Sequence, residues 1–111
     1  MAREKPYEIV YTRETKQHFR VIPKKHHSAI FDEIEERLSR DPLVPDMNKR
    51  EMRSGTLPRH LGIDVWRLRL GLNNAFRALY RVDEEERLVE VLAIGVKINN
   101  RYFFGGEEWV V

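Results

Sequence analysis

The sequence VWRLRL-GLNN-AFRALYRV, residues 65–82, predicts a β-hairpin with a short turn at residues 71–74. In both arms of this hairpin, bulky apolar side chains alternate with arginines. Because successive side chains of a strand point to opposite faces of the sheet, one face of the hairpin is apolar and the other is basic. The basic face carries Arg67, Arg69, Arg77 and Arg81. This face is either a solvated surface or a binding site for an anion.

Two helices are predicted before the hairpin, after a first strand at residues 7–11. Thr12 is a suitable N-cap for the first helix, and Pro23 ends this helix after Ile22. A second helix is expected over residues 24–40, because apolar residues recur there every four positions. These apolar residues are Ile30, Ile34 and Leu38.

The second half of the chain predicts strands. A loop over residues 41–51 leads to a short strand at Met52–Ser54, and residues 56–64 are irregular. After the hairpin, residues 88–96 form an apolar central strand, and the tail from Lys97 leaves the sheet and reaches back over it. The expected fold is α+β, with two N-terminal helices on one face of a small, mainly antiparallel sheet of four to five strands.

The composition narrows the class of protein. The 111 residues are 41% hydrophobic and 34% charged, which suits one globular domain spanning residues 1–111. The absence of cysteine excludes disulfides, thiolate nucleophiles and cysteine-based zinc sites. No apolar run approaches the ~20 residues of a membrane span, and the polar N-terminus lacks the apolar core of a signal peptide. We therefore expect a soluble cytoplasmic protein that does not bind membranes.

Charge is distributed unevenly along the chain. The segment 49–81 contains eight basic and two acidic residues, which gives it a charge of +6, whereas residues 83–111 carry −4. A basic block of this size in a small domain is typical of a surface that binds a polyanion such as nucleic acid. A solvated charged surface is the alternative, and charge alone does not separate the two.

Three segments of the sequence together resemble the RelE/ParE superfamily of bacterial toxins. They are the alternating basic strand VWRLRLG at 65–71, the aromatic-arginine strand FRALYRVD at 76–83 and the strand VLAIG at 91–95. The order of one strand and two helices before them, and the Asp41-Pro42 step after the second helix, also match the family.

The resemblance implies a microbial-RNase-like fold and the role of toxin in a type II toxin–antitoxin pair. In the RelE-like branch, the activity implied is metal-independent, ribosome-dependent cleavage of messenger RNA, with no cofactor. The partners implied are a cognate antitoxin, messenger RNA and the ribosome. The alternatives are a ParE-like toxin directed at DNA gyrase, and a protein of the toxin fold that only binds its antitoxin.

The resemblance also assigns roles to residues. The family's functional positions fall on Arg67, Arg69, Arg77, Lys97 and Tyr102. We assign Arg69, Arg77, Lys97 and Tyr102 to catalysis, and Arg67 to substrate binding together with Arg50 and Arg53 of the basic block. Arginine suits the stabilisation of a phosphate transition state, because its planar donor fork stays charged.

The general base stays unassigned. Arg69 stands where RelE-like enzymes use a lysine, and an arginine in a protein does not give up its proton. The remaining candidates are Lys97, His60, Glu107 and Glu108. The two histidines His26 and His27 are expected at the surface, and no third residue at a suitable spacing completes a metal site with them. Arg81 is expected to pair with Asp83 or Glu84 rather than bind substrate.

Overall fold

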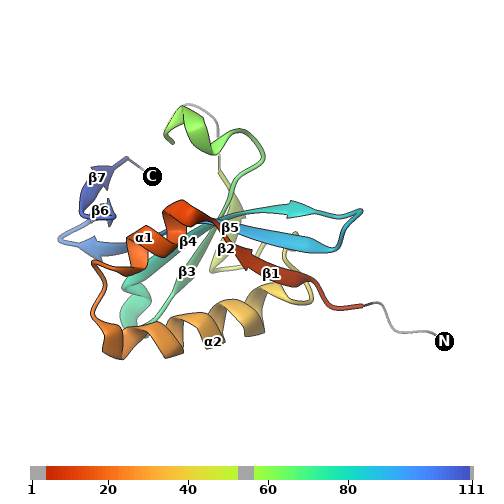
Figure 1. The fold of residues 1–111 in the computed structure, drawn as a ribbon, viewed down its shortest axis with the longest axis horizontal. Coiled ribbons are helices and arrows are strands. Elements are labelled where there is room, and N and C mark those ends of the chain that lie inside the picture. Colours follow the sequence, from red (N-terminus) through yellow and green to blue (C-terminus); the bar gives the residue numbers. More distant parts are fainter. Residues whose placement is uncertain (1–4, 53–56, 111) are drawn as a thin grey trace.

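The computed structural model describes residues 5–52 and 57–110, which form two α-helices and seven β-strands (Figure 1). This is the α+β class that the sequence predicts. Three 3₁₀ turns occur in addition, at Lys24–His26, Arg59–Leu61 and Leu72–Asn74. The elements are β1 (Glu8–Tyr11), α1 (Arg13–Phe19), α2 (His27–Leu38), β2 (Lys49–Glu51), β3 (Trp66–Leu70), β4 (Phe76–Asp83), β5 (Leu88–Ile98), β6 (Arg101–Phe104) and β7 (Glu107–Trp109).

The strands form one sheet in the order β2-β3-β4-β5-β6-β7, with antiparallel neighbours throughout. The first strand, β1, pairs in parallel with residues 88–91 of β5, and β6 pairs with residues 95–98 of β5. Since β4 pairs with residues 88–96 along the other edge of β5, β1 and β6 share a single edge of that strand.

The predicted strand count and the predicted tail were wrong. The sheet has seven strands rather than four to five, and the segment after Lys97 extends the sheet as β6 and β7 instead of leaving it. Two tight two-residue turns allow the chain to form β6 and β7. Asn99 and Asn100 have φ of 51° and 64°, and Gly105 and Gly106 have φ of 64° and 84°. Positive φ at both central residues gives the twist that suits a tight antiparallel hairpin.

Other boundaries differ by a few residues. Helix α1 ends at Phe19 rather than Ile22, and the second helix begins with a 3₁₀ turn and ends at Leu38. The short strand expected at Met52 lies earlier, at Lys49–Glu51, and residues 53 and 54 of that prediction lie outside the described residues.

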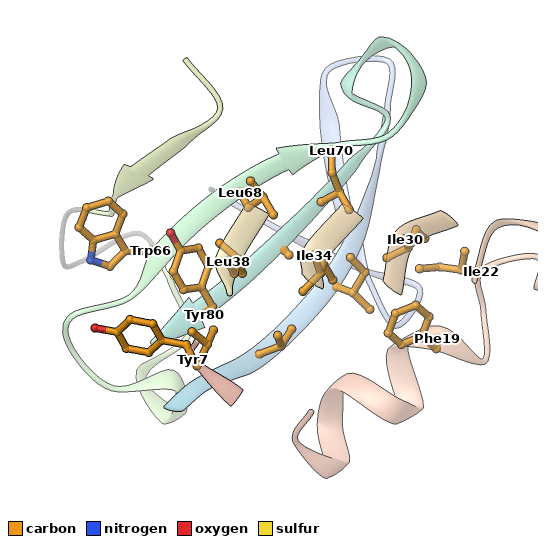
Figure 2. Packing of buried hydrophobic residues seen from close by; sticks show 14 residues of the cluster. Tyr7, Phe19, Ile22, Ile30, Ile34, Leu38, Trp66, Leu68, Leu70 and Tyr80 are labelled. Carbon is orange, nitrogen blue, oxygen red and sulfur yellow. The ribbon is translucent and has the colours of Figure 1, made fainter. Parts of the chain in front are cut away.

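The main core lies between the helices and one face of the sheet (Figure 2). Ile30, Ile34 and Leu38 of α2 are at most 2% exposed and share this core with the apolar side chains of β3 and β4. Trp66 and Tyr80 belong to it, as predicted, and the buried Tyr80 hydroxyl donates to the Pro42 carbonyl at 2.6 Å. The alternating hairpin thus turns its apolar face to the helices.

Helix α1 closes the gap that β1 and β6 leave along the edge of β5. Its N-cap Thr12 accepts from the Thr15 amide at 3.2 Å, as the sequence predicts. The buried Thr15 hydroxyl donates to the Val91 carbonyl at 2.7 Å, and the Thr12 amide donates to the same carbonyl at 3.1 Å. Buried strand-edge groups that no neighbouring strand reaches are therefore satisfied by the helix.

The opposite face of the sheet is partly covered rather than fully open, contrary to expectation. A second apolar cluster lies there, built from the segment before β3, from β4 and β5, and from the C-terminal hairpin, which we define as β6 and β7. Its buried members are Leu61, Val65, Leu79, Leu92, Ala93, Phe104 and Trp109. None of the helices in the described ranges is long and apolar enough to cross a membrane.

Candidate functional site

Four arginines meet on the sheet face opposite the helices, at one end of β2, β3 and β4. In the strand register Arg50 lies opposite Arg67, and Arg69 lies opposite Arg77. Directly opposed residues in an antiparallel pair point to the same face, so all four share one surface. We call Arg50, Arg67, Arg69 and Arg77 the arginine cluster.

Arg77 is the most buried member of the arginine cluster, at 3% exposure. Its Nη1 donates to the carbonyl of Asn74 and, at 3.0 Å, to that of Phe76. The Tyr102 ring lies over the guanidinium, with 5.2 Å between Cζ and the ring centroid. Burial lowers the pKa of Arg77 while Tyr102 raises it, and the side chain stays protonated at neutral pH.

Arg67 and Arg69 are half-buried beside Arg77. Burial, followed by the charges of Arg50, Arg69 and Arg77, lowers the pKa of Arg67 to about 10. Arg69 Nη2 donates to the Met47 carbonyl. The cluster is therefore a concentrated positive charge held in place by the backbone, an arrangement suited to an anion.

The arginine cluster also contains buried hydrogen-bond donors that have no partner. The buried Nε atoms of Arg67, Arg69 and Arg77 have no hydrogen-bond partner, and in the part of the chain that the structure describes no carboxylate pairs with any member of the cluster. Because a buried donor without a partner costs free energy, a ligand that accepts from these atoms is favoured.

The structure brings Tyr102 to the arginine cluster and places Lys97 next to Tyr102. Lys97 and Tyr102 are opposed in the β5–β6 pair and so lie on the same face as Arg77. Lys97 is exposed. Arg53, a predicted substrate-binding residue, lies outside the described residues.

The other candidate bases lie elsewhere. His60 Nε2 is 2.9 Å from a Glu14 carboxylate oxygen, and the His60 ring packs against Trp109. Glu108 pairs with Arg101 at 3.4 Å. The charge of Glu107 raises the pKa of the buried His18, against the larger lowering by burial. Within the described residues, none of these groups contacts the arginine cluster.

Arg81 has a structural role, but its predicted partners were wrong. It pairs with Glu90 of β5 at 3.3 Å, rather than with Asp83 or Glu84, and it donates to the Leu61 carbonyl at 2.9 Å. A bulge between Leu79 and Tyr80 shifts the register of the β4–β5 pair and sets Arg81 opposite Glu90.

Sequence reasoning missed His18. This residue of α1 is 5% exposed, and its Nδ1 accepts a hydrogen bond from the Ile94 amide at 3.2 Å. The i,i+4 spacing of Glu14 and His18 is visible in the sequence, but the contact with β5 depends on the tertiary fold. No group of three or more histidine, aspartate or glutamate side chains suited to a metal ion occurs in residues 5–52 and 57–110.

Comparison with known proteins identifies a relative in fold. No protein-family model and no curated protein sequence matches the chain. Among solved structures, the chain is similar to the toxin–antitoxin complex RelBE2 from Mycobacterium tuberculosis, with a TM-score of 0.64 and 25% identity over 83% of this chain and 99% of that chain. This similarity confirms the resemblance seen in the hairpin sequence, and the chain is RelE-like in both fold and sequence pattern.

Proposed function

We propose that this protein is the toxin of a type II toxin–antitoxin pair and a metal-independent endoribonuclease that cleaves messenger RNA on the ribosome. The observation that carries the proposal is the arginine cluster, whose four cations share one sheet face, with Arg77 against the Tyr102 ring and no acidic partner in the described residues. The similarity to a RelE toxin in a toxin–antitoxin complex supports the toxin role.

The proposed chemistry is attack of an RNA 2′-hydroxyl on the adjacent phosphate. The attack places extra negative charge on the phosphate oxygens, and Arg77 is positioned to stabilise that charge. Arg50, Arg67 and Arg69 hold neighbouring phosphates. The fixed donors of these arginines supply the charge stabilisation without a metal ion.

Two proton transfers complete this reaction. Tyr102 is the proposed acid for the leaving 5′-oxygen, because its ring lies against Arg77. Lys97 is the proposed base, because it lies opposite Tyr102 in the sheet and shares its face. Arg69 cannot take this role, since its guanidinium keeps its proton.

The partner proposed for the toxin is a cognate antitoxin. The similar solved structure is a toxin–antitoxin complex, which supports a protein partner of this kind. We propose that acidic residues of the antitoxin cover the arginine cluster and so compete with RNA phosphates. We also propose that the protein acts as one domain, residues 1–111, in the cytoplasm.

The test is cleavage of a defined messenger by the purified protein, with and without ribosomes and with and without EDTA. We expect cleavage that requires ribosomes, survives EDTA and disappears in Arg77→Ala. The product ends should be a 2′,3′-cyclic phosphate and a 5′-hydroxyl, since these are the ends that 2′-hydroxyl attack leaves. Cleavage that Arg77→Ala retains at the wild-type rate contradicts the proposal.

A second candidate is a toxin that binds without cleaving RNA, including a ParE-like toxin directed at gyrase. The two backbone carbonyls to which Arg77 Nη1 already donates, and the 3% exposure of this residue, favour this candidate. Gyrase-dependent DNA breaks without messenger cleavage would support the gyrase-directed form. Absence of both activities, together with antitoxin binding, would support the binder.

A further inference from the structure

The C-terminal hairpin brings Tyr102 to the arginine cluster, and aromatic packing fixes the hairpin on the sheet. Trp109 lies opposite Tyr102 in the β6–β7 pair, and its ring stacks on Phe104 with 4.5 Å between centroids. Phe104 lies opposite Gly95 of β5, and a Cβ atom on that glycine would approach the Phe104 ring to 2.4 Å. The hairpin is therefore seated on β5 through Phe104.

His18 of α1 also contacts this aromatic pair. Its ring meets Trp109 at 5.5 Å and Phe104 at 6.2 Å, both edge to face. Its Cδ2 lies 2.8 Å from the point where a Cβ on Gly105 would stand. One side chain of α1 thus touches both strands of the hairpin and the turn between them.

The same ring is anchored to β5. The Ile94 amide donates to His18 Nδ1 at 3.2 Å, in a place where β1 and β6 leave that amide without a strand partner. An imidazole nitrogen accepts a hydrogen bond only while it carries no proton. The observed contact therefore requires the neutral ring, with its proton on Nε2.

We propose that neutral His18 is a positioning residue, which holds the C-terminal hairpin against β5 and so keeps Tyr102 over Arg77. The inference rests on the proposed function for its effect on activity alone. The placement of the hairpin can be measured whether or not the protein cleaves RNA.

The charged groups around His18 set the direction of its pH dependence. Glu14 of the same helix lies 3.8 Å from Nε2, His60 approaches from the Arg59–Leu61 turn, and Glu107 belongs to β7. Burial is the largest influence and lowers the pKa of His18, Glu14 and Glu107 raise it, and His60 lowers it. The net shift of the pKa is downward.

The sign of the effect follows from this shift. Between the ordinary histidine pKa of about 6.5 and the lower value in the seated state, the released state binds more protons than the seated one. The hairpin is thus fully held above that ordinary value. It loses stabilisation as the pH falls below it, until His18 is protonated in the seated state as well.

The first experiment measures hairpin placement in the full chain by NMR. Amide hydrogen-exchange protection across the β5–β6 pairs, and contacts between the Tyr102 ring and the Arg77 side chain, are compared between pH 7.5 and pH 5.5. We expect protection factors in β6 to fall by about tenfold or more at the lower pH, the effect of losing a buried hydrogen bond. The midpoint of this loss should coincide with the His18 imidazole titration. A midpoint that follows His60 instead, or no loss, overturns the inference.

Variants of the neighbouring groups provide a signed test. His60→Gln removes a group that lowers the pKa of His18 and should move the midpoint to higher pH, whereas Glu14→Gln should move it to lower pH. His18→Asn keeps an oxygen acceptor near Nδ1 but cannot be protonated, so its hairpin protection should not change over this range. The matched control His26→Asn should behave as wild type. Wild-type pH dependence in His18→Asn contradicts the proposal.

The activity readout separates this inference from the proposed function. If the protein cleaves messenger RNA, the additional fall of its rate below about pH 6.5 that accompanies hairpin release should disappear in His18→Asn and persist in His26→Asn. Hairpin release that follows His18 in a protein without RNA cleavage supports the positioning role and refutes the proposed activity. If the protein cleaves RNA but the protection of its hairpin does not depend on His18, the result supports the activity and refutes the positioning role.

Discussion

Arg77 and Arg81 are the same residue type on the same face of β4, yet their surroundings give them different roles. Arg81 has a carboxylate partner in Glu90 at 3.3 Å, so its charge is neutralised within the sheet. Arg77 has two backbone carbonyls and the face of Tyr102 as partners, none of which is a carboxylate. The sequence predicts both arginines on one face, but the partner of each depends on strand register.

Gly95 is the residue at which the C-terminal hairpin approaches the sheet most closely. In Gly95→Ala the new Cβ would lie 2.4 Å from the Phe104 ring and 2.6 Å from the Phe103 carbonyl, which is backbone and cannot rotate away. We expect a loss of about 1–3 kcal/mol in the free energy of unfolding, the usual cost of overpacking. Urea denaturation measures this loss. The exposed Lys97→Ala in the same strand is the control, with an expected change within about 0.5 kcal/mol. An equally small change in Gly95→Ala would show that the hairpin can move aside.

Helix α1 supplies hydrogen-bond partners for an edge of strand β5. The carbonyls of Val91 and Leu92 and the amide of Ile94 would be orphaned between β1 and β6, and Thr12, Thr15 and His18 satisfy them. The sequence predicted Thr12 as the N-cap correctly, since capping is local. It gave no sign of the roles of Thr15 and His18, because these depend on a strand more than 70 residues away.

Thr15→Val tests the role of this helix. The valine keeps the shape of the buried threonine but removes the hydroxyl that donates to the Val91 carbonyl at 2.7 Å. We expect a destabilisation of about 1–2 kcal/mol, because the carbonyl keeps one donor, the Thr12 amide, and loses the other. Thermal unfolding monitored by circular dichroism measures it. Gln17→Ala, exposed on the same helix, is the control; a Thr15→Val protein as stable as this control would refute the capping role.

Alternation of apolar and polar residues explains which strands the sequence predicted and which it did not. The alternation of residues 65–82 gives each arm an apolar face, so periodicity locates β3 and β4 closely. Residues 97–109 show no such alternation, and β6 and β7 are formed by two tight turns at Asn99-Asn100 and Gly105-Gly106. These turn pairs are hairpin signals that could have located both strands. The contact of Tyr102 with Arg77 follows from this C-terminal hairpin, so periodicity did not predict it, although the family resemblance assigned both residues to one site.

At the scale of the whole molecule, charge is separated along the sheet. The arginine cluster meets β4 at its start, near Arg77, whereas β4 ends at Asp83 in an acidic turn that continues through Glu84, Glu85 and Glu86. Figure 1 shows that β6 and β7 lie at the end of the sheet opposite this turn. A polyanion is therefore attracted to one end of the protein and repelled from the other.

This separation predicts the salt dependence of RNA binding. If the four arginines of the cluster each neutralise one phosphate, the logarithm of the association constant for single-stranded RNA should fall with the logarithm of salt concentration with a slope of about −2.8. Arg67→Ala should make the slope shallower by about 0.7, and Arg81→Ala should leave it unchanged. Fluorescence anisotropy over a salt series measures these slopes. Equal effects of the two substitutions would mean that charge in general, and not the cluster, binds RNA.

The most direct test of the account compares Arg77→Ala with Arg81→Ala in single-turnover cleavage of ribosome-bound messenger RNA. Both variants make the same change on the same face of the same strand, but Arg77 contacts Tyr102 and Arg81 is paired with Glu90. We expect a rate loss of about 10²–10³-fold for Arg77→Ala, the cost of removing a donor to the transition-state charge, and a loss of less than about threefold for Arg81→Ala. Equal rate losses in two folded variants, or no loss in either, would contradict it.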